Sequence, residues 1–200
     1  SLCEQDHHGV VACALGWACW KTYLGRPEAD PYRRSAMASL AVSLSAACRH
    51  EDAMSVLEAE LSLQRRIGAP PANILIAQGN LASTYKELGR GEEAMRMQRD
   101  VYFGSVKLHG AEHPETLREA NNYANSLRNQ RRFKEAKSLM REKIPVARRV
   151  LKVDDELMLM MRANYAKALY SEPSATLDDL REAVTTLEDT ARTARRVMGG

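Results

Sequence analysis

Apolar and polar residues follow one another along this chain in a pattern that returns at a fixed interval. An asparagine, a large apolar residue and an alanine occupy positions 80–82, and the same residue types return at 122–124 and 164–166. Each return lies 42 positions further along the chain. A constant period of roughly 20 to 50 residues is typical of stacked repeats, in which each unit packs on its neighbours.

Within each interval the apolar positions have helical spacing, and glycine or proline interrupts them. The sequence shows no alternation of the kind expected for a strand. It therefore predicts an all-α fold, an α-α superhelix of antiparallel helix pairs. The helices are expected at about 7–24, 31–47, 51–67, 71–88, 92–108, 114–129, 133–151, 156–170 and 177–198.

Residue types at the helix starts support these boundaries. Asp30 precedes Pro31, which suits an N-cap followed by a proline at the first helical position. Asp155 is placed to cap the helix at 156–170 in the same way. Thr176-Leu177-Asp178-Asp179 resembles a capping box at the start of the last helix.

Small residues recur at equivalent positions in both helices of each expected pair. They are Ala41, Ala82, Ala124 and Ala166 in the first helices and Ala53, Ala94, Ala136 and Ala183 in the second. Facing alanines would bring two helix backbones close together, and the apolar side of one pair would be covered by the next.

These positions also suggest how the chain is divided. We expect residues 1–30 to form an N-terminal helix that is a truncated or capping unit, and residues 31–200 to form the repeat domain. Its repeats are expected at about 31–69, 70–111, 112–153 and 154–198. Because the chain begins without a methionine, it is expected to be part of a longer protein.

Three short motifs give this layout a resemblance to a known family. They are His113-Pro114-Glu115-Thr116-Leu117, Asn121-Asn122-Tyr123-Ala124 and Arg132-Phe133-Lys134-Glu135-Ala136. The pattern resembles the tetratricopeptide repeat (TPR), in the longer form of kinesin light chains and related proteins, over about residues 31–198. The turn glycine, Gly89, is replaced by Cys48 and Arg131 in the neighbouring repeats.

The resemblance implies a TPR-like solenoid that serves as a protein–protein interaction scaffold. In such proteins the first helices line a concave groove that accepts peptides, and an asparagine there often bonds the peptide backbone. An amide suits that task because it is both donor and acceptor. The candidate groove residues are Asn80, Ser83, Lys86, Arg118, Asn121, Asn122, Asn125, Arg128, Asn164 and Lys167.

We expect this groove to be polar and mildly basic, and to prefer a peptide partner with acidic residues. The alternative is that the asparagines brace the helix turns or are simply solvated, since exposed polar residues are common.

A second candidate surface is the basic side of the helix at 133–152. Its members are Lys134, Lys137, Arg141, Arg148 and Lys152, spaced to share one side. They could bind nucleic acid or an anionic surface. We favour a solvated outer face instead, because the net charge is only +3 and no aromatic residues are interleaved for base stacking.

The sequence offers no signature of catalysis. It has no glycine-rich phosphate loop, nucleophile elbow or H-E-x-x-H helix, so we expect no enzyme and no cofactor, although the array could regulate a larger enzyme. Metal binding is not expected either. The candidate ligands Cys3, His7, His8, Cys13 and Cys19 lack the paired spacing of zinc sites.

The chain has no apolar run of the roughly 20 residues needed to cross a bilayer, so no membrane contact is expected. Its four cysteines have no framework spacing, which favours a reducing, cytoplasmic setting.

Overall fold

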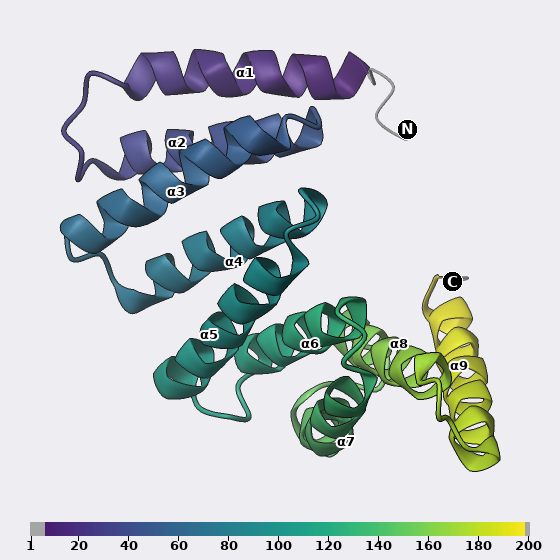
Figure 1. The fold of residues 1–200 in the computed structure, drawn as a ribbon. Helices are drawn as coiled ribbons and strands as arrows, with labels where there is room; N and C mark the ends of the chain where they lie inside the picture. Colours follow the sequence, from purple (N-terminus) through teal and green to yellow (C-terminus); the bar gives the residue numbers. More distant parts are fainter. Residues whose placement is uncertain (1–6, 199–200) are drawn as a thin grey trace. The chain divides into compact units, whose positions relative to one another are not determined.

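A computed structural model describes residues 7–198 of the chain as α-helices joined by turns, with no strand in that range (Figure 1). The helices are α1 (His7–Tyr23), α2 (Pro31–Ala46), α3 (His50–Arg66), α4 (Pro71–Glu87), α5 (Gly91–His109), α6 (Pro114–Asn129), α7 (Phe133–Val150), α8 (Glu156–Ser171) and α9 (Leu177–Met198). The predicted all-α fold is confirmed, and the helices lie close to the expected positions.

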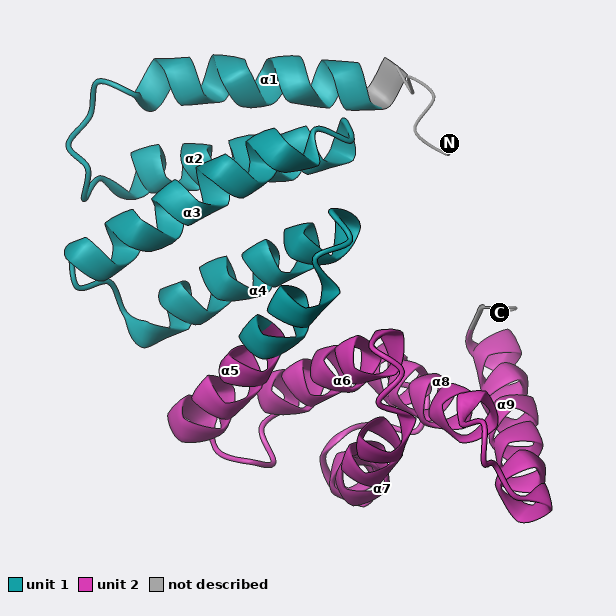
Figure 2. Cartoon of the chain, in the orientation of Figure 1, with its two compact units in different colours: residues 1–97 teal, residues 98–200 magenta. Residues whose placement is uncertain are grey.

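The chain divides into two compact units, residues 1–97 and 98–200, which are coloured separately in Figure 2. The boundary falls within α5. The division into an N-terminal helix at 1–30 and a repeat domain at 31–200 stays a prediction.

The predicted helix caps are present. Asp30 Oδ1 accepts hydrogen bonds from the backbone N–H groups of Tyr32 and Arg33, at 2.8 and 3.2 Å. Asp155 Oδ1 accepts from Leu157 N at 2.9 Å. The capping box at the start of α9 is also confirmed, because Thr176 Oγ1 and the Asp179 carboxylate bond each other's backbone N–H groups.

The turn between the two helices of a pair has the same geometry in three places. Cys48, Gly89 and Arg131 have φ angles of 56°, 73° and 59°, in the left-handed region. In each turn the next residue, always arginine, donates its backbone N–H to a carbonyl five residues earlier: Arg49 to Leu44, Arg90 to Tyr85 and Arg132 to Leu127. This is a Schellman motif, which satisfies the last carbonyls of the first helix.

The same three arginines hold the first turn of the second helix. Each pairs with an acidic residue three positions later: Asp52, Glu93 and Glu135. Arg90 also lies over the Tyr85 ring, 4.4 Å from its centroid. These pairs are exposed, so each contributes little to the free energy of folding.

In residues 1–97 the core joins α2, α3, α4 and the start of α5. Its buried members are Ala41, Leu57, Leu61, Ala77, Leu81, Tyr85 and Ala94. A smaller cluster of Cys13, Leu40, Leu44 and Ala53 holds α1 against α2 and α3.

The packing of α1 depends on its small residues. Gly9, Cys13 and Gly16 are buried, while Val10, Val11 and Leu15 are more than half exposed. A Cβ atom at Gly16 would lie 2.0 Å from Ser43 Oγ and 3.0 Å from Ser43 Cβ of α2, so a larger residue would require Ser43 or the helix to shift. The large apolar residues of α1 therefore lie mostly on its exposed side, and its buried side consists of small residues.

In residues 98–200 one cluster joins the end of α5 to α6, α7, α8 and α9. Its largest fully buried members are Leu117, Met140, Met158, Met161 and Leu169. The predicted alanine positions are buried in both units, at no more than 3% exposure for any of the eight.

Replacing Ala136 with leucine should overpack the contact between α7 and its neighbours, because Ala136 is 1% exposed. We expect the free energy of unfolding to fall by about 1–3 kcal/mol in urea denaturation followed by circular dichroism. The control is Ala191→Leu, an exposed site on α9, where a change within about 0.5 kcal/mol is expected. Equal losses at the two sites would contradict this account.

Candidate functional site

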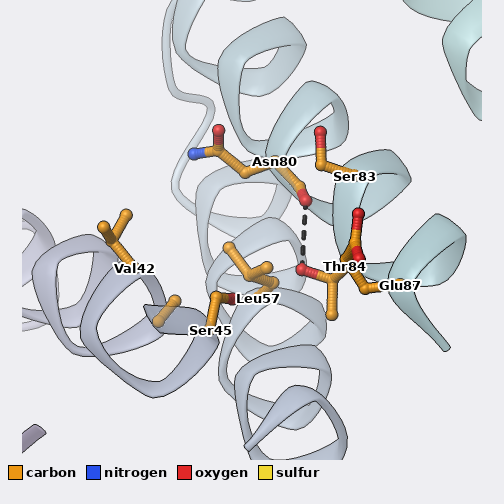
Figure 3. A pocket seen from close by; sticks show the side chains of 8 residues that line it. Val42, Ser45, Leu57, Asn80, Ser83, Thr84 and Glu87 are labelled. Atoms are coloured by element: carbon orange, nitrogen blue, oxygen red, sulfur yellow. Dashed lines mark hydrogen bonds between the residues drawn. The ribbon is translucent and has the colours of Figure 1, made fainter. Parts of the chain in front are cut away.

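A pocket of about 200 Å³ lies in residues 1–97, lined by residues of α2, α3 and α4. Figure 3 shows Val42 and Ser45 of α2 on one side and Asn80 and Ser83 of α4 on the other. The buried residues Ala41 and Leu57 lie at its base, and its rim carries the exposed Val42 together with polar residues. The structure therefore brings the predicted groove residues Asn80 and Ser83 together at one hollow.

The Asn80 side chain is half-buried, and its amide forms no hydrogen bond to any residue within 7–198. Ser83 Oγ, in contrast, donates to the Gly79 carbonyl at 3.2 Å. An amide beside an apolar hollow can offer both a donor and an acceptor to an incoming chain.

The charge around this pocket differs from the expected basic groove. Its one charged lining residue is Glu87. Lys86, which was expected to supply positive charge, pairs with Glu87 at 3.4 Å. This part of the surface is therefore close to neutral.

In residues 98–200 two of the predicted groove residues bond each other. Asn121 is 5% exposed, and its Oδ1 accepts a hydrogen bond of 2.8 Å from Asn164 Nδ2. The bond joins α6 to α8, which are first helices of successive pairs. At these two residues the amides stabilise helix packing.

Asn122, next to Asn121, is exposed and donates to Glu119 Oε2 at 3.3 Å. Gln98 Nε2 donates to the same oxygen at 2.6 Å. Burial raises the pKa of the Glu119 carboxyl, and these two hydrogen bonds partly oppose the increase.

The other predicted groove residues of this unit differ in the ion pairs and hydrogen bonds that they form. Arg118 approaches Glu115 at 3.7 Å. Arg128 Nη2 donates to Asn125 Oδ1 at 2.7 Å, while its buried Nε has no hydrogen-bond partner. Lys167 is exposed and makes no ion pair within the described part of the chain.

The basic side of α7 is partly covered by α8 and α9. Lys137 Nζ lies 2.6 Å from Asp179 Oδ1, and the two side chains are only 24% and 15% exposed. Arg141 donates to the Tyr165 hydroxyl and to Glu182. The expectation of a wholly solvated face is therefore wrong for Lys137, and fewer cations are available to bind nucleic acid or an anionic surface.

Within residues 7–198 no group of three potential metal-ligating side chains is present, and Cys3 lies outside the described residues. Cys13 is a buried free thiol and Cys19 a half-buried one. The expected reducing, cytoplasmic setting stays a prediction. No helix in the described range is long and apolar enough to cross a membrane.

The paired helices and their repeated turns define a helical repeat protein. Residues 74–115 and 116–156 match the tetratricopeptide repeat family. A comparison with curated proteins found no match.

Solved structures with the same fold cover nearly the whole chain. A kinesin light chain-like protein of Podospora anserina with nearly identical TPR-like repeats has a TM-score of 0.77 at 20% identity, over 94% of this chain and 88% of that one. A variant of that protein has a TM-score of 0.74 at 18% identity, over 98% and 100%. BtubC (BKLC) of P. vanneervenii has a TM-score of 0.65 at 14% identity, over 98% and 94%.

Residues 74–156 therefore carry tetratricopeptide repeats, and the chain as a whole shares the fold of the kinesin light chain-like repeat structures, as the sequence motifs predicted. Repeats of this family are generally used as scaffolds for protein interaction.

Replacing Asn164 with alanine should leave the buried Asn121 Oδ1 without its partner. An unpaired buried acceptor costs about 1–3 kcal/mol, so we expect a loss of that size in the free energy of unfolding in urea. Asn129→Ala, at an exposed site on α6, is the control and should change stability by no more than about 0.5 kcal/mol. An unchanged Asn164→Ala variant would show that the amide pair does not stabilise the packing.

The contact between α7 and α9 should make stability depend on pH. The hydrogen bond from Lys137, together with those from Thr176, lowers the pKa of Asp179 from 3.8 to about 2. A carboxyl group whose pKa is lowered in the folded state stabilises the fold at pH values above its unfolded-state pKa. This stabilisation is lost as the pH falls through the folded-state pKa. The advantage of the native protein over Asp179→Asn should therefore shrink between about pH 4 and pH 2.

Thermal unfolding at a series of pH values measures this difference. Asp178→Asn is the matched control, because Asp178 is adjacent but 91% exposed. A constant difference between native protein and Asp179→Asn across this range would contradict the assignment.

Proposed function

We propose that this chain captures extended peptide segments of partner proteins, and that the pocket between α2 and α4 is one of the contact sites. The observation that carries the proposal is the unbonded amide of Asn80 at the rim of an apolar hollow. The amide would bond a peptide unit of the partner, and an aliphatic side chain of the partner would enter the hollow.

The size of these interactions implies several contact sites. Burying one aliphatic side chain contributes about 1.5–3 kcal/mol, and a hydrogen bond adds about 0.5–1.5 kcal/mol. Their sum corresponds to a Kd near the millimolar range, before the cost of ordering the peptide. A useful affinity therefore needs further contacts beyond this pocket. In residues 98–200 the candidate contact residues are Asn122 and Lys167, which would belong to a second, separate contact site.

We further propose that acidic residues of the peptide are favoured near Lys167. It is exposed and makes no ion pair to another described residue. Lys86 and Arg118 contribute less, because Glu87 and Glu115 already approach them. The chain itself is proposed to have no catalytic role, and its cytoplasmic setting stays a prediction.

Selection from a displayed random peptide library on the purified chain would supply ligands for a direct test. Asn80→Ala should weaken binding of the selected peptides by about two- to twelvefold, which corresponds to the loss of one hydrogen bond of about 0.5–1.5 kcal/mol. Ser83→Phe should abolish binding by filling the pocket. Both effects are measured by fluorescence anisotropy of labelled peptide.

The matched control is Ser138→Phe, which places the same side chain at an exposed site on α7. It should leave binding unchanged. Failure to select any peptide, or equal affinity for native protein, Asn80→Ala and Ser83→Phe, would overturn the proposed function.

A further inference from the structure

A second pocket, of about 240 Å³, lies wholly within residues 98–200 and is lined by α7, α8 and α9. Its walls carry three arginines, of which Arg141 and Arg148 belong to α7 and Arg162 to α8. Two acidic residues from α9, Glu182 and Asp189, face them. The pocket is separate from the hollow beside Asn80.

The charges near Arg141 are compensated. Arg141 Nε donates to the Tyr165 hydroxyl at 3.1 Å, and this hydroxyl donates to Glu182 Oε1 at 2.7 Å. Arg141 Nη2 also donates to Glu182 Oε2 at 3.3 Å. One guanidinium and one carboxylate therefore neutralise each other, with the tyrosine hydroxyl between them.

The charges near Asp189 are only partly compensated. Arg162, whose side chain is only 14% exposed, approaches Asp189 Oδ2 at 3.7 Å, which is too long for a hydrogen bond. Arg192 approaches the other oxygen at the same distance of 3.7 Å. Arg148 makes no ion pair and no hydrogen bond to any residue between 7 and 198. On this side of the pocket Arg148 and Arg162 face the one carboxylate of Asp189, which leaves an excess of one positive charge.

An anion in the pocket would balance this excess charge. Arg162 makes no hydrogen bond within the described range, and the Asp189 carboxylate at 3.7 Å compensates its charge only in part. The hydroxyl of Thr186, which also lines the pocket, makes no hydrogen bond within the described range and adds a further donor.

We propose that the Arg148–Arg162 side of this pocket binds a phosphate group. The planar fork of arginine suits oxyanions with several oxygens. Two guanidinium groups can bond the three acceptor oxygens of a phosphate monoester, whereas a single carboxylate offers only two oxygens. The phosphate group is either free inorganic phosphate or an ester on a side chain of a partner protein.

The test follows the arginine Nε–Hε signals of the whole chain by NMR while inorganic phosphate is added at constant ionic strength. The signals of Arg148 and Arg162 should shift to saturation. Acetate, a carboxylate with one charge, should bind at least about tenfold more weakly. Shifts that grow linearly without saturation, or equal affinity for acetate and phosphate, would overturn the proposal.

Two variants on α7 show whether binding is local. Arg148→Ala should remove saturable binding, and because Arg148 is exposed the substitution should leave the fold intact. Arg149→Ala removes the same charge one residue away, where Arg149 pairs with Glu112 at 2.7 Å. This variant should keep saturable phosphate binding. Loss in both variants, or in neither, would contradict the assigned site.

A further titration with O-phosphoserine and O-phosphotyrosine separates the two sources. Tighter binding of either than of inorganic phosphate points to a phosphorylated side chain of a partner. Tighter binding of inorganic phosphate points to the free ion. Either result supports the site.

Discussion

The close approach of paired helices at buried alanines is the constraint on which the rest of the structure depends. One alanine near the middle of each first helix and one near the start of each second helix are almost wholly buried, from Ala41 and Ala53 to Ala166 and Ala183. A larger side chain at these buried positions would overpack the contact between helices, and the remaining apolar residues cover the next helix. Packing between neighbours then accounts for the clusters in each unit.

Polar contacts at the helix turns add to this packing. The arginine after each turn satisfies backbone carbonyls through its N–H group and pairs with an acidic residue through its side chain. These contacts are exposed and individually weak, but they recur at the same place in three pairs. The α7–α9 contact through Lys137 and Asp179 differs, because both side chains are mostly buried.

Helix positions, caps and alanine contacts could be predicted from the sequence, because they depend on local spacing and on residue size. The roles of the asparagines could not. The 42-residue interval aligned Asn80 with Asn122, yet it is the adjacent Asn121 that bonds Asn164. Neighbouring residues on a helix point about 100° apart, and only packing decides which of them meets the next helix. For the same reason Lys137 could not be distinguished from solvated lysines.

The turn at Arg131 has a consequence for how the fold could be improved. Arginine there adopts a left-handed backbone that glycine adopts at the equivalent Gly89, and this conformation costs a residue with a Cβ atom about 1–2 kcal/mol. Its side chain is exposed, so nothing in the core requires it. Replacing Arg131 with glycine should therefore increase the free energy of unfolding through a single change at a solvent-facing position.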